Sequence, residues 1–390
     1  MPQPPDAPSP DRSAIPRLVP YRTDWLFRGL SVLSRRSPFM TGTWYFLISF
    51  GGVYVLGFLT GQFAGKNGLG PMYGQVLDNI NLAFLAPAGA ALLCNLYNVI
   101  EDGVGRLSRE SLVADDRVPE LERIVARYDR VYNNAWVAAG ALGFSLLINV
   151  YNYFHKTDSW LAIHGGVTGL YGRAFIVVNF AMIALILYKC AVTTFLIQDI
   201  LGSKLDVRIE PMHPDGAGGL QHIGRLANAV NSFVLVVLIF LSLLVLFDPF
   251  TANVLAYKVV FWVVFLLSPF FLLLSLSKAH RKMSARKAED LERLALTFQH
   301  HYAKLTRGGK GKPYEVEDAN EIVAVHGLYE IVDKMPVWPF DTTSVRRFAS
   351  LFLVPAALFL VNQLTSTDSL LYRVVRYLLK NFGVPVPEDI

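Results

Sequence analysis

A short loop near the middle of the chain carries the residue types and spacing that most readily suggest chemistry. It reads Glu210-Pro-Met-His-Pro-Asp-Gly-Ala-Gly-Gly-Leu220. Prolines on both sides of the histidine predict a tight turn, and Asp215 is a candidate N-cap for a following helix. Gly216, Gly218 and Gly219 allow the backbone to approach other groups closely. The loop therefore predicts either a helix cap or a small binding site.

Two kinds of ligand suit this loop, and a purely structural role competes with both. A helix N-terminus presents free amides, and the nearby Arg208 and His222 favour an anion such as phosphate. His213 and Asp215 could instead bind a cation, although two groups do not complete a coordination shell. We expect the structural role, a hinge or cap, and predict no metal site and no cofactor.

The same loop resembles a known pattern. His213-Pro-Asp215 followed by Gly218-Gly-Leu220 is similar to the HPD-x-x-GGL loop of uncharacterised bacterial multi-spanning membrane proteins. The similarity covers this loop alone and transfers no activity. It implies a multi-pass protein of the bacterial inner membrane.

A second chemical signal is a set of amides spaced three or four residues apart inside apolar segments. Side chains at this spacing share one face of a helix, so each pair can line a hydrated path. The same amides can equally hold helices together by hydrogen bonds. The candidate pore or ligand residues of this kind are Asn95 and Asn98 with Asp102 below them, Asn149 and Asn152, and Asn228 with Asn231. Asn179 is a single amide inside another apolar segment.

Lys189 is the ionisable residue that lies well within an apolar segment. Such a charge usually faces the protein interior or water, which makes Lys189 a candidate functional residue. Glu101 and Asp102 are its expected partners. The alternative is that the lysine lies near the end of its helix and extends its ammonium toward the interface.

These residues must be positioned by membrane-spanning helices. Of the 390 residues, 53% are hydrophobic and 17% are charged, whereas soluble domains carry about 25% charged residues. A bilayer core about 30 Å thick needs roughly 20 apolar residues in a helix. Seven windows of this kind occur: Trp44–Phe63, Ile80–Ile100, Ala135–Phe154, Ala174–Ile197, Leu226–Phe247, Val254–Leu276 and the shorter Phe348–Leu364.

The basic residues predict the orientation. Of the 36 Lys and Arg residues, 28 lie in the N-terminal arm and in the loops on the same side, and 7 lie on the other side. Cytoplasmic loops carry the excess of Lys and Arg. We therefore predict an all-α polytopic membrane protein with about seven transmembrane helices, an inside N-terminus, an outside C-terminus and cytoplasmic helical extensions. Contact with anionic lipid accounts for the positive charge, and no nucleic-acid partner is predicted.

The predicted organisation has five parts. Prolines in the first forty residues predict a disordered arm. Near the C-terminus, an apolar helix face opposed by basic residues predicts an interfacial helix. The parts are a disordered Pro-rich arm (1–40), a six-helix membrane region with a cytoplasmic helix near 118–134 (41–277), a cytoplasmic helical segment (278–347), the last transmembrane helix (348–366) and an amphipathic interfacial tail (367–390).

Two functions remain open at this point. Polar groups inside spans favour an ion or small-solute channel or transporter, and the layout is similar to that of insect chemoreceptor channels. The alternative is a membrane-anchored signalling or scaffold protein that acts through its cytoplasmic helices. No motif of a known catalytic site is present, so an enzyme is the least favoured class. Membrane lipids, a second copy of the chain and a cytoplasmic protein are the expected partners.

Overall fold

The fold is helical throughout the part of the chain that the structure describes. This computed structural model describes residues 18–64, 72, 79–109, 117–155, 166–202, 205, 209, 213, 215, 217–247, 255–307, 316–339 and 342–365. Its helices are α1 (Trp25–Ser34), α2 (Pro38–Phe46), α3 (Gly52–Leu59), α5 (Ala86–Arg109), α6 (Val118–Tyr132), α7 (Ala135–His155), α8 (Gly166–Gly202), α9 (Gln221–Phe247), α11 (Leu255–Arg307), α12 (Val316–Asp333) and α13 (Thr342–Thr365), with π-helical segments η2 (Leu47–Gly51) and η4 (Asn81–Leu85).

Among the described residues, six helical stretches are long and apolar enough to cross a membrane, which indicates a multi-pass membrane protein. They are Pro38–Leu59, Asn81–Arg106, Val118–Tyr151, Gly166–Gly202, Gln221–Leu243 and Phe261–Lys304. Helices suit this environment because every backbone polar group is satisfied within the segment. Each of the first six predicted windows overlaps one of these stretches. The seventh lies in α13, where the apolar stretch among the described residues is Phe348–Leu358, so a seventh crossing stays a prediction.

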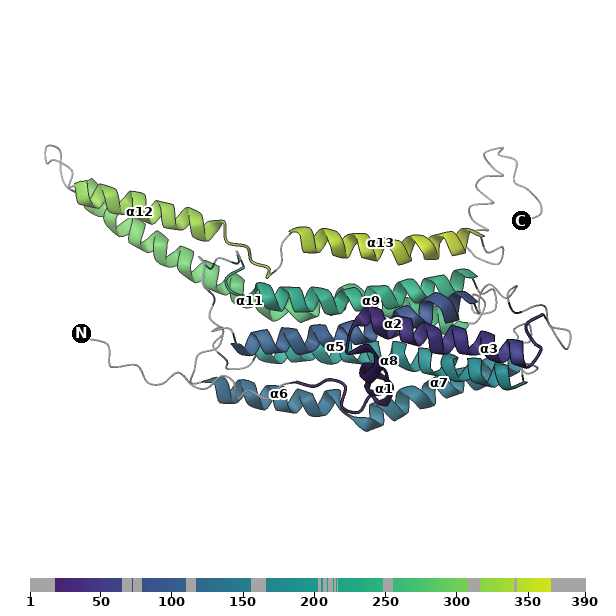
Figure 1. The fold of residues 1–390 in the computed structure, drawn as a ribbon. Helices are drawn as coiled ribbons and strands as arrows, with labels where there is room; N and C mark the ends of the chain where they lie inside the picture. The colour runs from purple at the N-terminus through teal and green to yellow at the C-terminus, as the bar shows by residue number, and fades with distance from the viewer. Residues whose placement is uncertain are drawn as a thin grey trace, which may run out of the picture.

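The long helices run side by side, with α5, α8 and α9 packed together (Figure 1). In the best apolar window of Gln221–Leu243, 61% of the residues are buried inside the protein, and in that of Asn81–Arg106 the share is 50%. The stretch Val118–Tyr151 contains α6 and most of α7, and its best apolar window buries only 11%. The centre of the bundle is therefore formed by α5 and α9, and α7 presents its apolar side chains outward.

One end of the bundle carries most of the additional structure. There α6 packs on α8, and α11 continues beyond the bundle and pairs with α12 in a projecting hairpin (Figure 1). The N-terminal arm and α1 lie toward the same end. We call this end, formed by the arm, α6 and the α11–α12 hairpin, the basic end, because the predicted cytoplasmic Lys and Arg residues belong to it.

The N-terminal arm differs from the prediction of disorder up to residue 40. From Leu18 onward it is folded against the bundle, and α1 begins at an N-cap in which the Asp24 carboxylate accepts a hydrogen bond of 2.9 Å from the Phe27 amide. Tyr21, Phe27 and Leu30 are buried in the core together with Leu18. The burial of these apolar side chains orders the arm despite its prolines. They recur at intervals of three to six residues and pack against one surface of the bundle. Residues 1–17 and the predicted interfacial tail at 367–390 lie outside the described residues.

Candidate functional site

A small cavity lies inside the bundle between η4, α5, α8 and α9. Its volume is about 40 Å³, enough for one or two water molecules. The walls are mainly apolar, with Met182, Ile186 and Val237 among them, and the amides of Asn81 and Asn179 supply the polar groups. A cavity of this size cannot hold a sugar or an amino acid, but it can hold water or a small ion.

Asn179 is the polar side chain that defines this cavity. Its Oδ1 accepts a hydrogen bond of 2.7 Å from the Tyr45 hydroxyl of α2. Among the described residues, its buried Nδ2 has no hydrogen-bond partner, and the residue as a whole is 8% exposed. An unsatisfied buried amide costs about 1–3 kcal/mol. An apolar residue at this position of α8 would avoid the cost. The asparagine therefore indicates that Nδ2 donates a hydrogen bond to water or to a bound solute.

Two π-helical segments lie beside this cavity and contact each other. Asn81 begins η4, and η2 interrupts the first membrane helix between α2 and α3. The Ser49 hydroxyl of η2 donates to its own helix at the Tyr45 carbonyl over 2.7 Å, and also to the Leu82 carbonyl of η4 over 3.3 Å. Single π-helical turns inside α-helices occur frequently at functional sites. Here they place Tyr45 and Asn81 toward the same region of the bundle.

Lys189 is buried at the basic end, with 3% exposure. Its ammonium donates a hydrogen bond of 2.6 Å to the Pro20 carbonyl of the N-terminal arm and a second one to the Tyr132 carbonyl at the end of α6. The Tyr97 and Tyr132 rings lie 5.7 and 5.5 Å from the ammonium. Main-chain carbonyls and aromatic rings therefore satisfy this cation.

The predicted partners of Lys189 are wrong. Glu101 forms an ion pair of 3.2 Å with Arg36, and Asp102 forms one of 3.0 Å with Arg106 on the next turn. The carboxylates whose negative charge attracts the Lys189 ammonium are those of Asp24 and Asp129. The prediction failed because Asp24 belongs to the arm that we expected to be disordered.

The position of Lys189 along the bundle explains why a charge is tolerated there. The Arg36 carbonyl, just before α2 begins, accepts hydrogen bonds from Cys94 Sγ at 3.4 Å and Asn98 Nδ2 at 3.1 Å. Tyr97, which contacts Lys189, lies on this same turn of α5. Lys189 is thus level with the end of the first membrane helix rather than with its middle. Its ammonium is buried among carbonyls and rings and does not extend toward the interface, as the alternative interpretation expected it to.

The remaining predicted amides do not gather at one site. Asn95 is exposed and Asn98 holds the Arg36 carbonyl, as described above. Asn149 donates to the Arg173 carbonyl over 3.4 Å, which joins α7 to α8. Asn152 lies on α7, but its side chain is outside the described part. The hydrogen bond of Asn98 joins α5 to the turn before α2, and that of Asn149 joins two helices; they do not show a shared hydrated path.

Asn228 and Asn231 lie on α9, and they differ from each other. Asn228 is half-buried, and its main-chain carbonyl accepts from Ser232 over 2.8 Å. Asn231 is buried, and neither polar atom of its side chain has a partner within the part of the chain that the structure describes. Cys190 Sγ contacts the Val230 carbonyl at 3.5 Å, so Asn231 lies at about the level of Lys189. Asn231 is therefore a second buried amide with unused hydrogen-bonding capacity, nearer the basic end.

The His-Pro-Asp loop is a helix cap. Asp215 Oδ1 accepts from the amides of Ala217 and Gly219 at 2.9 and 3.0 Å, and Oδ2 accepts from Gln221, the first residue of α9, at 3.2 Å. His213 Nδ1 lies 2.8 Å from Oδ1. The Asp215 carboxylate thus occupies the amides that a phosphate would need, which disfavours the anion-site interpretation.

The glycines of this loop serve the cap geometry. Gly218 and Gly219 have φ values of +64° and +89°, a conformation in which residues with a Cβ are strained. Gly216 lies outside the described residues. Burial raises the pKa of Asp215, but hydrogen bonds from Gly219, Ala217, Gln221 and His213 outweigh it and lower this pKa below 3.8. Over the described residues, no three His, Cys, Asp or Glu side chains come together as a metal site.

Comparison with protein-family models, curated proteins and solved structures finds no match for this chain. The candidate site therefore rests on its own geometry. Sequence reasoning noticed Asn179 as an isolated amide in an apolar run, but Tyr45 and Asn81 gave no comparable signal, since neither belongs to a pair at helical spacing.

Proposed function

We propose that this multi-pass membrane protein is a channel or transporter for a small solute, and that the cavity between η4, α5, α8 and α9 is its solute site. The supporting observation is the unpaired Nδ2 of Asn179. An N–H group donates a hydrogen bond, so the occupant is an acceptor such as water or a small anion. The volume of about 40 Å³ suits a solute of that size. We place the protein in the bacterial inner membrane with the basic end in the cytoplasm.

The charge distribution favours an anion over a cation. The chain has a formal net charge of +5, and Lys189 is the nearest buried charge along α8. Lys189 is ten residues from Asn179, or about 15 Å of helix. A positive potential at one end of an apolar path raises the local concentration of anions. Chloride is therefore the first solute to test, with water as the neutral alternative.

In this account, the path is closed in the present structure. Met182 and Ile186 are buried in the 15 Å of α8 between the two polar levels, with 2% and 1% exposure. The N-terminal arm covers Lys189 through the Pro20 carbonyl. Conduction in this account requires the apolar layer to become hydrated and the arm to move.

Replacing Asn179 with leucine is expected to reduce chloride flux into proteoliposomes to the level of protein-free vesicles. The substitution removes the only hydrogen-bond donor of the Asn179 side chain from the cavity and makes entry of an anion costly. Asn95→Leu is the matched control, because Asn95 is exposed on α5 and should leave flux unchanged. The double variant Asn179→Leu, Tyr45→Phe avoids leaving the tyrosine hydroxyl without its acceptor, so its thermal unfolding separates loss of flux from misfolding. Undiminished flux in a folded Asn179→Leu protein contradicts the proposal.

A second candidate function, a scaffold or signalling role, is supported by the α11–α12 hairpin. The hairpin projects from the bundle (Figure 1) and presents exposed apolar side chains, with Leu296 at 61% and Val323 at 71% exposure. Exposed apolar groups on a projecting element suit association with another protein surface. We take a second copy of this chain as the partner.

In this second account, the full-length double variant Leu296→Glu, Val323→Glu should have a lower molar mass in light scattering than the unmodified protein in the same detergent. A charge at the contact opposes burial, so the dimer dissociates. Gln299→Glu, at an exposed polar position of α11, is the control and should keep the original mass. Equal masses for all three proteins count against hairpin-mediated self-association.

A further inference from the structure

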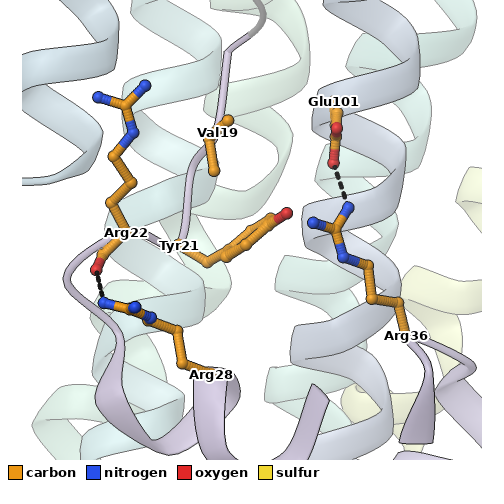
Figure 2. Close-up of a pocket in the computed structure, with 6 residues that line it drawn as sticks. All are labelled: Val19, Tyr21, Arg22, Arg28, Arg36 and Glu101. Atoms are coloured by element: carbon orange, nitrogen blue, oxygen red, sulfur yellow. Dashed lines mark hydrogen bonds and ion pairs between the residues drawn. The ribbon is translucent and has the colours of Figure 1, made fainter. Parts of the chain in front are cut away.

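A second, larger cavity opens at the basic end, between the N-terminal arm, α1 and α5. Its volume is about 640 Å³. We call it the arginine pocket; Figure 2 shows that its side chains come from the arm, from α1, from the turn before α2, and from α5. The lining residues are Val19, Tyr21, Arg22, Arg28, Arg36 and Glu101.

The arginine pocket has an excess of positive charge. Its lining contains three guanidinium groups and one carboxylate. The Glu101 carboxylate forms an ion pair of 3.2 Å with Arg36. Arg22 reaches Asp129, outside the lining, at 3.4 Å, but its side chain is 61% exposed. Arg28 donates to a neutral group, the Arg22 carbonyl, over 3.3 Å (Figure 2). The pocket therefore retains cationic groups whose charge a bound anion would neutralise.

The backbone that carries these arginines is held in place. The Arg22 amide donates to Asn133 Oδ1 over 2.8 Å, and the Val19 amide donates to Asp129 Oδ1 over 3.2 Å. Arg36 has a φ of +61°, which is unusual for a residue with a Cβ. Hydrogen bonds from α5 to its carbonyl hold this conformation. The pocket is thus preorganised, which lowers the entropic cost of binding.

The surroundings of the arginine pocket are those of a membrane interface. Pro38, the first residue of α2 and of the first membrane-spanning stretch, follows Arg36 by two positions. Trp25, Val32 and Phe39 are exposed to 59%, 79% and 79%. Helix α1 crosses the bundle instead of running along it (Figure 1). A short helix with exposed apolar side chains beside arginines is typical of an element at headgroup level, where tryptophan is also favoured.

We propose that the arginine pocket binds the phosphate of an anionic phospholipid headgroup in the leaflet at the basic end. Guanidinium groups bind phosphate oxygens with paired, charge-assisted hydrogen bonds. Basic pockets between membrane helices on the cytoplasmic side bind anionic headgroups. The exposed apolar residues beside the pocket accommodate the acyl chains, which a free phosphate does not have. This site is separate from the Asn179 cavity, so either proposal can fail without the other.

The test uses the full-length protein in a neutral detergent and measures the shift in thermal unfolding temperature on adding short-chain phosphatidylglycerol, short-chain phosphatidylcholine or inorganic phosphate. We expect phosphatidylglycerol alone to stabilise the protein. In Arg28→Gln its apparent affinity should fall about tenfold, the equivalent of about 1.4 kcal/mol or one charge-assisted hydrogen bond. Arg28 is suited to this test because its guanidinium donates to a neutral carbonyl. Its replacement leaves no buried charge without a partner, so the variant should fold.

Arg123→Gln is the control, since Arg123 is exposed on α6 and does not line the pocket; it should bind phosphatidylglycerol as the unmodified protein does. Three results would overturn the proposal. Equal stabilisation by the two lipids would show that headgroup charge is not recognised. Equal stabilisation by phosphatidylglycerol and inorganic phosphate would assign the pocket to a free anion. Unchanged affinity in Arg28→Gln would place lipid binding elsewhere.

Discussion

Replacing Asp215 with alanine is expected to lower the free energy of unfolding by about 2–3 kcal/mol, since the substitution removes a helix cap and leaves buried amides unsatisfied. The Asp215 side chain is 8% exposed and accepts from the amides of Ala217 and Gly219 in the loop and from that of Gln221, the first residue of α9. Because α9 lies at the centre of the bundle, this local loss affects the whole fold. Chemical unfolding in a fixed detergent, followed by circular dichroism, measures the difference.

The same carboxylate makes the free energy of unfolding depend on pH. Its pKa is lowered in the folded protein below 3.8, so its contribution is complete above the unfolded pKa of about 4 and is lost as the pH falls through the folded value. Asp215→Asn retains acceptor capacity without charge, and its stability relative to the unmodified protein should improve as the pH falls below about 4. A difference that is constant from neutral to acidic pH, or an alanine variant as stable as the original, would show that the carboxylate is not the cap.

Replacing Lys189 with methionine is expected to release the N-terminal arm. Methionine has a similar length but donates no hydrogen bonds, so the Pro20 and Tyr132 carbonyls lose their partner. Loss of about 2–3 kcal/mol of local stability corresponds to roughly a hundredfold faster amide exchange. Hydrogen–deuterium exchange of residues 18–24 measures this effect.

Lys278→Met provides the control for this experiment. Lys278 donates to the Gln198 carbonyl over 2.9 Å, away from the arm, so exchange in residues 18–24 should not change. If Lys189→Met leaves the arm as protected as before, the hydrogen bonds that the arm amides donate to Asn133 and Asp129 are sufficient to hold it, and the lysine does not control the arm.

The sequence predicted the helices well because hydrocarbon imposes a simple requirement on them. A span must satisfy its backbone internally over about 20 apolar residues, and α8 meets this requirement in a single run. The cap at Asp215 was also predictable, since it depends on residues within six positions. In both cases the interactions are local, and local interactions leave a recognisable pattern in the sequence.

The environment of Lys189 could not be predicted in the same way. The Pro20 carbonyl that accepts its hydrogen bond is 169 positions away in the sequence. Every residue has a main-chain carbonyl, so the residue type at that position does not indicate the contact. Spacing likewise predicted that Asn95 and Asn98 share a face, but not which face is buried: Asn95 is exposed, whereas its neighbours Leu96 and Tyr97 have 0% exposure. The cavity at Asn179 arises from packing between helices, and the π-helical segments beside it have no known sequence signature.

The most direct test of the central claim is a cryo-electron microscopy structure in lipid nanodiscs, at a resolution that shows ordered water and ions, in chloride buffer. The account predicts density in the cavity between η4, α5, α8 and α9, within about 3 Å of Asn179 Nδ2. Replacing chloride with bromide in a second sample distinguishes an anion from water. An empty cavity, or an Asn179 Nδ2 bonded to a protein carbonyl, would contradict the account, because the unpaired amide on which the solute site rests would then have no role in binding.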